Sequence, residues 1–395
     1  MGVGARSATQ RPGQIPALRA LIPNPQLPIV MFPCIASLSF GLLLSQTILR
    51  MKPVNADSKA LTEHKLIGTS AKLKMIYSTR RRFDRVAGHL WTIIPGLLSL
   101  VSRPTQPKAR LFRTVTPDPV LGHVRLTGLL SEVSGADTIV LIVHGLSGNA
   151  MSHYCAHAAR AAVRAGYSAL RLSLRGADYS GEDILHGGIT QDIWAALAAP
   201  LIAEYKHVLL LGYSVGGHVV LRAAVEQLDR RVRGAAAICP PLDLNHATIA
   251  FDDPTRAPYR SHIFRGLNRA YAATAARGRV AVPLSVVERA RTCRERDALT
   301  VVNRFGFRNV DDYYARESVA PRLKNLRVPS LVVSSRHDPL VPAETVRPAL
   351  ESASRALSVA WVETGGHVYF PKSLDLGQPG PTGLEAQVIR WLSEQ

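Results

Sequence analysis

The sequence contains only four cysteines, and none of them stands in a motif that would bind a metal or build a disulfide framework. Cys34, Cys155, Cys239 and Cys293 are widely spaced, and no C-x-x-C pair occurs. A disulfide-stapled fold and a zinc knuckle are therefore not indicated, and a reducing compartment is the simpler inference. The chain also lacks H-E-x-x-H, G-x-x-x-x-G-K-[ST] and G-x-G-x-x-G. Metalloprotease, P-loop and dinucleotide-binding functions have no support, and we expect no metal or organic cofactor.

Acidic residues are scarce at the front of the chain. In residues 1–115, 17 lysines and arginines stand against Asp57, Glu63 and Asp84, a net charge of +14 that leaves +5 for the remainder. Such a basic arm is typical of a segment that contacts an anionic membrane or nucleic acid, and equally of a solvated tail. Because the folded part carries little of the charge, we expect no specific nucleic-acid partner.

A candidate membrane segment lies within this basic front. Residues 27–49 are uncharged and largely apolar, and they are long enough to cross a bilayer. The positive flank after them would keep the remainder of the chain in the cytoplasm, anchored to the inner face of the membrane. Three other interpretations stay open: a buried segment, a secretory signal, and a true start at Met51 or Met75. Residues 1–79 are therefore taken as an N-terminal extension, and residues 80–395 as the folded domain.

The rest of the chain alternates strands with helices. Residues 86–101 are apolar but short and interrupted by Pro95-Gly96, so we expect them to pack on the domain rather than span a membrane. A continuous apolar run of four to eight residues predicts a buried strand, and a 3.6-residue period predicts a helix. Eight strands are expected at residues 111–115, 123–129, 138–143, 168–172, 207–211, 234–238, 330–334 and 358–362. Helices are expected at residues 156–165, 192–204, 343–350 and 384–392, and after the turn at residue 214, where apolar residues recur at 220, 224 and 228.

This alternation predicts an α/β fold with a mainly parallel, doubly wound sheet. Residues 241–325 interrupt it with helical, arginine-rich sequence that is too long for a loop, so we expect a cap inserted over the sheet edge. The insertion holds 15 basic and 9 acidic residues, a net charge of +6. Solvated surface charge explains this better than recognition of an anionic substrate.

The most informative stretch surrounds Ser214. A short apolar run at residues 207–211 leads into Gly212-Tyr213-Ser214-Val215-Gly216, and a helical pattern follows. The pattern G-x-S-x-G predicts a sharp strand-to-helix turn that holds the serine hydroxyl above the carboxyl end of a sheet. The glycines let strand and helix approach closely, and the first N–H groups of the helix point at any negative charge beside Ser214.

Two further polar residues follow predicted strands, in the order Ser214, Asp338, His367. A serine hydroxyl becomes a good nucleophile when an imidazole takes its proton, and a carboxylate fixes the tautomer of that imidazole. The sequence thus predicts Ser214 as nucleophile, His367 as base and Asp338 as acid. The loop 144–148 carries glycines after another strand, so the N–H groups of Leu146 and Val215 are the predicted oxyanion hole.

Each assignment has competitors. Asp338 is also suited to capping the next helix, and Asp243 and Asp178 are alternative acids. His337 is the nearest alternative base, but it adjoins the acid and comes early in the chain order. His218, on the helix after the nucleophile, is expected to point away from Ser214, and His144 is expected to stabilise its loop.

From about Arg85 onward the chain resembles the YheT-type branch of the α/β-hydrolase superfamily, a group of predicted esterases related to the mammalian ABHD lipid hydrolases. The resemblance implies an eight-stranded α/β-hydrolase fold with a helical cap, and the same triad of Ser214, Asp338 and His367. Residues 1–79 fall outside it, and the family usually has Gln where this chain has Trp91. The matching stretches are 88–95, 144–148, 175–176, 186–192, 212–217, 312–318, 338–339 and 366–367.

The sequence therefore predicts a serine hydrolase that cleaves carboxylic or lipid esters through an acyl-enzyme. One alternative is an acyltransferase or lipid-remodelling enzyme that uses the same triad. Another is a non-catalytic protein that binds membranes through its basic N-terminal extension. The expected partner of the first two is a small-molecule ester or lipid, with membrane association through the N-terminal extension.

Overall fold

The computed structural model describes residues 1, 73–75, 84–101, 106–227 and 229–395. The described elements belong to a compact unit that begins at Gly68. The candidate membrane segment, residues 27–49, lies outside the described residues. Among the helices that are described, none combines the length and the hydropathy needed to cross a bilayer.

A mainly parallel sheet forms the centre of this unit, in the order β1-β9-β8-β7-β6-β4-β5-β3-β2. Strands β2 and β3 form a hairpin, and β3 also runs antiparallel to β5, while the other neighbours are parallel. The eight expected strands are all present, and β1 adds a short edge beside β9. Their bounds are β1 Leu73–Met75, β2 Arg110–Asp118, β3 Gly122–Ser131, β4 Thr138–Val143, β5 Ser168–Ser173, β6 His207–Tyr213, β7 Val232–Ile238, β8 Ser330–Ser335 and β9 Leu357–Val362.

Helices cover both faces of the sheet, as its apolar strands require. In β4, alternate side chains enter two separate cores: Ile139 and Leu141 face one, and Val140 and Ile142 face the other. The first core is closed by α4, α6 and α13, and the second by α3 and α14. These helices span α3 His153–Arg164, α4 Gln191–Ala198, α5 Pro200–Ala203, α6 Val215–Glu226, α13 Ala343–Glu351 and α14 Leu384–Ser393.

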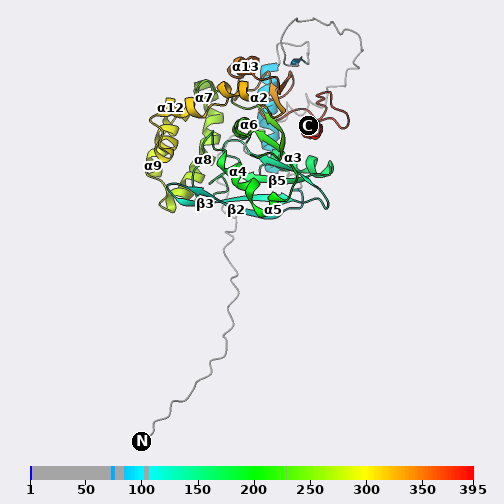
Figure 1. Cartoon of the computed structure of the whole chain (residues 1–395). Helices are drawn as coiled ribbons and strands as arrows, with labels where there is room; N and C mark the ends of the chain where they lie inside the picture. The colour runs from blue at the N-terminus through cyan, green and yellow to red at the C-terminus, as the bar shows by residue number, and fades with distance from the viewer. Residues whose placement is uncertain (2–72, 76–83, 102–105, 228) are drawn as a thin grey trace. The chain divides into compact units, whose positions relative to one another are not determined.

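The insertion between β7 and β8 is helical, as expected. Figure 1 shows α7, α8, α9 and α12 gathered on one side of the unit. Its segments are α7 Leu244–Asp252, η1 Pro254–Arg256, α8 Ala257–Ala276, α9 Leu284–Val287, α10 Cys293–Asp297, the π-helical η2 Ala298–Val302, α11 Asn303–Phe305, α12 Val310–Glu317 and η3 Ala320–Asn325.

One expectation needs correction, and one segment whose secondary structure was left open is now defined. The single helix expected at residues 192–204 is split into α4 and α5, because Ala199 before Pro200 adopts an extended conformation with φ −62° and ψ 138°. The apolar segment before the hairpin is a helix, α2 Asp84–Val101, despite Pro95-Gly96 within it. It packs on the folded domain, as expected, and contacts the loops that follow β8 and β9.

Candidate active site

Ser214 occupies a strained turn between β6 and α6. Its backbone has φ 53° and ψ −124°, a conformation that L-residues rarely adopt. The neighbouring glycines explain how the turn fits. A Cβ atom on Gly216 would lie 2.3 Å from the carbonyl oxygen of His144, and one on Gly212 would lie 2.2 Å from the carbonyl oxygen of Gly216. Only glycine allows strand, turn and helix to approach this closely.

Asp338 and His367 form a hydrogen-bonded pair at the ends of β8 and β9. The distance from His367 Nδ1 to Asp338 Oδ2 is 2.8 Å. The other carboxylate oxygen accepts the N–H groups of Leu340 and Val341 at 2.8 and 2.9 Å. Because a carboxylate only accepts, Nδ1 of the imidazole carries the proton and Nε2 is left to accept another. The side chains of Asp338 and His367 are both buried.

Helix α2 holds the loop that carries His367. The N–H of His367 donates to Thr92 Oγ1 at 2.8 Å, and the Thr92 hydroxyl donates to the carbonyl of Gly88 at 2.8 Å. A Cβ atom on Gly88 would lie 2.1 Å from the carbonyl oxygen of His337, and one on Gly366 would lie 2.4 Å from Thr92 Oγ1. The same helix therefore touches both loops of the Asp338–His367 pair. Sequence reasoning did not assign this role, although residues 88 and 92 are one helical turn apart in a stretch that carries the resemblance.

Ser214 and His367 line one pocket together with Leu146 and Val215. The cavity volume is about 160 Å³, and its walls come from the sheet edge and from the helical insertion. The structure thus brings the five predicted site residues to one place: Asp338 bonds His367, and the other four line the pocket. Among the hydrogen bonds of the described residues, none joins Ser214 to His367. Such bonds are commonly long before substrate is bound.

The predicted oxyanion loop is fixed by His144. The N–H of Leu174 donates to His144 Nε2 at 3.1 Å, so Nδ1 carries the proton and donates to the carbonyl of Gly145 at 2.8 Å. Burial lowers the pKa of His144 to about 4, which keeps the ring neutral. A turn from Gly145 to Gly148 follows, in which Ser147 has φ 58°. Val215, the first residue of α6, faces the same pocket, and the N–H groups of a first helical turn have no partner inside the helix.

The competing residues have other partners. His218 lies between the carbonyls of Pro241 and Glu317, at 2.6 and 2.9 Å from its two ring nitrogens. Asp243 caps α7 by accepting the N–H of His246.

Asp178, the other alternative acid, accepts the hydroxyl of Thr127 at 2.6 Å and the N–H of Ser180 at 3.0 Å. His337 is not among the residues that line the pocket. Among the described carboxylates, the one that bonds His367 is Asp338.

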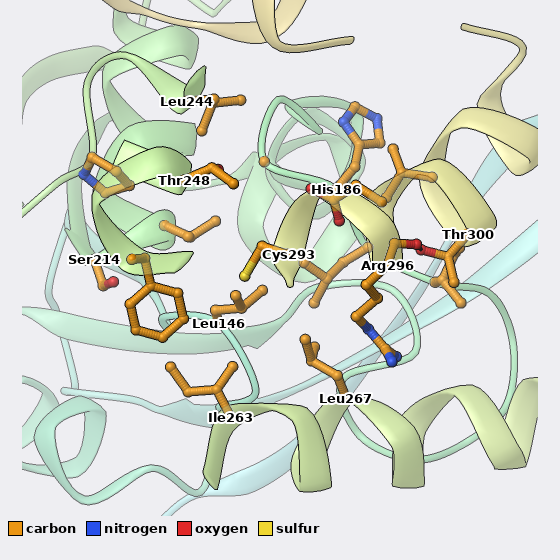
Figure 2. Close-up of a pocket in the computed structure, with 18 of the residues that line it drawn as sticks. Leu146, His186, Ser214, Leu244, Thr248, Ile263, Leu267, Cys293, Arg296 and Thr300 are labelled. Atoms are coloured by element: carbon orange, nitrogen blue, oxygen red, sulfur yellow. Dashed lines mark hydrogen bonds between the residues drawn. The ribbon is translucent and has the colours of Figure 1, made fainter. Parts of the chain in front are cut away.

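The remainder of the pocket is mainly apolar but ends in polar residues. Figure 2 shows Ser214 at one end and Arg296 and Thr300 at the other, with Ile263 and Leu267 along one wall. The arginine lies over the rings of Phe264 and Tyr271.

Asp297 belongs to the same pocket and is held by the hydroxyl of Tyr314 at 2.8 Å. Burial raises the pKa of Asp297 to about 7. A polar group of a substrate could therefore meet an uncharged carboxyl group here below pH 7.

A buried ion network joins the insertion to the sheet. Arg175 contacts Asp192 at 2.7 Å, and Asp118 and Asp183 at 3.1 Å each. Arg304 of α11 contacts the same Asp118 and Asp183 at 2.8 Å. Arg304, which belongs to the insertion, is thus paired with carboxylates that lie outside the insertion.

One trio of potential metal ligands is present in the described part of the chain. Cys239 Sγ lies within 4.8 Å of ligand atoms of Asp338 and His367. The latter two are bonded to each other, and the thiol is placed to donate to the carbonyl of Gly366 at 3.8 Å. Burial raises the pKa of the Cys239 thiol, whereas a metal ligand must be a thiolate. These contacts suit a hydrogen-bonded acid–base pair better than a metal centre.

Comparison with known proteins gives one family and several relatives. A family model described as alpha/beta hydrolase fold matches residues 138–371. The chain is 28% identical over 264 residues to the protein named "Putative esterase YheT" of Escherichia coli (strain K12), a match that covers 64% of this chain and 76% of that one.

Two further relatives are lipases by name. The chain is 24% identical to "Monoacylglycerol lipase" of Saccharomyces cerevisiae, over 59% of this chain and 55% of the relative. It is 26% identical to "Phospholipase ABHD3" of Homo sapiens, over 58% of each chain. The match therefore spans somewhat more than half the length of these two relatives.

Proposed function

The chain belongs to the α/β hydrolase fold family, and from this premise we propose that it is a serine hydrolase that cleaves carboxylic esters through an acyl-enzyme. The named relatives are esterases and lipases, which supports ester hydrolysis. The single observation that carries the mechanism is the Asp338–His367 hydrogen bond of 2.8 Å, because it orients the imidazole that shares a pocket with Ser214.

Acylation begins when Ser214 Oγ attacks the ester carbonyl carbon and His367 Nε2 takes its proton. Asp338 stabilises the imidazolium that forms, through the proton on Nδ1. The N–H groups of Leu146 and Val215 stabilise the oxyanion, and each such donor is worth roughly a hundredfold or more in rate. The tetrahedral intermediate then breaks the bond to the alcohol, which leaves with the proton from His367.

Deacylation reverses these roles. His367 takes a proton from water as the water oxygen attacks the acyl carbon bound to Ser214. The second tetrahedral intermediate releases the carboxylic acid and returns the proton to Ser214 Oγ. An alcohol that enters in place of water would give acyl transfer instead, so adding glycerol and measuring the ratio of new ester to free acid separates the two reactions.

The pocket supports an acyl or lipid ester as substrate. Most of its lining is apolar, and Arg296 and Thr300 lie at the end opposite Ser214 (Figure 2). An alkyl chain would remain along the apolar walls while its carbonyl group reaches Ser214. The names of the lipase relatives agree with this class of substrate.

The direct test is the variant Ser214→Ala. We expect it to lose both hydrolysis of a short-chain p-nitrophenyl ester and covalent labelling by a fluorophosphonate probe, because both need the hydroxyl. Ser393→Ala, which removes a hydroxyl near the end of α14, is the matched control and should behave as the wild type. Labelling that persists in Ser214→Ala would assign the nucleophile to another residue.

A further inference from the structure

Helix α2 has an apolar stripe that the folded domain leaves exposed. Val86, Leu90, Ile93 and Ile94 are 59%, 38%, 43% and 36% exposed. At about 100° per residue they fall within roughly 100° of arc on one side of the helix. We call these four residues the α2 stripe.

The opposite side of α2 is the side that serves the active site. Gly88 and Thr92 lie roughly across the helix from the stripe and contact the loops of His337 and His367. The stripe is therefore not needed to attach the helix to the domain. Four large apolar side chains in one row on a surface usually mark an interaction site.

The charge of the neighbouring sequence identifies the partner. Arg80, Arg81, Arg82 and Arg85 stand directly before or at the beginning of α2, and residues 1–115 carry a net charge of +14. Apolar residues on one helical face beside a cluster of arginines are typical of a helix that lies in the interface of an anionic bilayer. An anionic bilayer matches both the apolar row and the arginine cluster.

We propose that the α2 stripe docks on the surface of an anionic lipid bilayer, with the helix lying in the interface. Because the other face of α2 bonds the N–H of His367 through Thr92, docking would also hold the base loop at the surface where lipid substrates are found. The coupling to turnover rests on the proposed function. The docking itself does not, so the two are tested separately.

The docking is tested by hydrogen–deuterium exchange on the full chain carrying Ser214→Ala, so that no catalysis intervenes. Vesicles of phosphatidylcholine with about 30% phosphatidylserine should slow exchange in peptides that cover residues 86–94. This measurement is local, so another membrane-binding segment in the chain would not produce the result. Unchanged exchange in these peptides would overturn the proposal, and so would equal protection by vesicles of phosphatidylcholine alone.

The variant L90Q/I93Q tests the stripe itself. Glutamine keeps the helix propensity while removing the apolar surface, so the slowing should disappear and vesicle binding through this face should fall by roughly tenfold or more. The control V120Q/L201Q changes two other exposed apolar residues, which are 70% and 44% exposed, and should bind as the wild type. Equal protection of the stripe variant would contradict lipid docking. If exchange in peptides that cover residues 86–94 slows without vesicles as the protein concentration rises, the stripe contacts a second copy of the chain instead.

The coupling to turnover has its own readout. With the hydroxyl of Ser214 restored, L90Q/I93Q should hydrolyse a soluble short-chain ester at the wild-type rate, and an ester embedded in anionic vesicles about tenfold more slowly. If the rate of hydrolysis falls equally for both substrates, the stripe supports the fold of the site rather than docking.

Discussion

Replacing Asp338 by asparagine removes the carboxylate of the Asp338–His367 pair but keeps the shape of the side chain. In the wild type, one carboxylate oxygen accepts the N–H groups of Leu340 and Val341, and the other faces His367 Nδ1. In Asp338→Asn the amide oxygen would stay with the two backbone donors, so the amide nitrogen would face the imidazole. Two N–H groups cannot bond each other, so His367 must move its proton to Nε2.

The magnitude follows from this change of tautomer. With a proton on Nε2, His367 cannot accept the proton of Ser214, and the loss for such a substitution in a serine triad is about 10⁴ in kcat. This corresponds to about 5 kcal/mol of transition-state stabilisation. KM should change little, since the pocket keeps its shape. The backbone donors remain bonded, so the variant should stay folded.

The assay is the steady-state hydrolysis of a p-nitrophenyl ester, together with a thermal melt to show that the protein is folded. Asp375→Asn is the matched control, because Asp375 also bonds a backbone N–H but is exposed and is not among the residues that line the pocket. A folded Asp338→Asn protein with kcat within tenfold of the wild type would refute the role of Asp338. The acid would then have to be sought elsewhere.

Two further predictions concern stability. The pKa of Asp297 is raised from 3.8 to about 7, so the folded chain keeps a proton that the unfolded chain loses between about pH 4 and 7. The free energy of unfolding of the wild type therefore falls as pH rises through this window, by up to about 4 kcal/mol. Asp297→Asn cannot titrate, so its melting temperature relative to that of the wild type should rise from pH 4 to 7. A difference in melting temperature that stays constant with pH would contradict the raised pKa. Gly216→Ala should cost about 3 kcal/mol in urea unfolding, because its Cβ would meet the His144 carbonyl at 2.3 Å. Gly234→Ala, whose Cβ would meet only side chains at 3.2 Å, is the control, and equal effects of the two would disprove the tight packing of the turn.

The parts that could be predicted are those encoded in local sequence. The run at β4 is apolar from Ile139 to Val143 because the strand is buried on both faces, and the structure places β4 at the residues expected. The turn at Ser214 was predictable because the G-x-S-x-G pattern is local, and a Cβ on Gly212 would lie 2.2 Å from the carbonyl oxygen of Gly216 in the same turn. Because each of Ser214, Asp338 and His367 follows a predicted parallel strand, the sequence also predicted that all three lie at the same edge of the sheet.

The parts that could not be predicted depend on contacts between distant segments. The bond between the N–H of His367 and Thr92 joins residues 275 positions apart, and nothing in either local sequence requires it. The interruption at Pro95-Gly96 left the secondary structure of residues 86–101 open, yet α2 continues through them. Local propensity is a weak guide when tertiary packing fixes a helix. The ion network of Arg175 and Arg304 could not be predicted either, because its members are far apart in the sequence. Taken alone, each arginine resembles a surface charge.

Helix α2 changes how the active site should be viewed. The G-x-S-x-G turn joins β6 directly to α6, so the residues that form it are neighbours in sequence. The Asp338–His367 pair instead lies on two loops, and α2 contacts both through Gly88 and Thr92. Loops are the more mobile parts of a fold, so the orientation of His367, the proposed base, depends on how firmly this helix is held. Conditions that order or release α2 should therefore act on turnover while leaving the nucleophile turn intact.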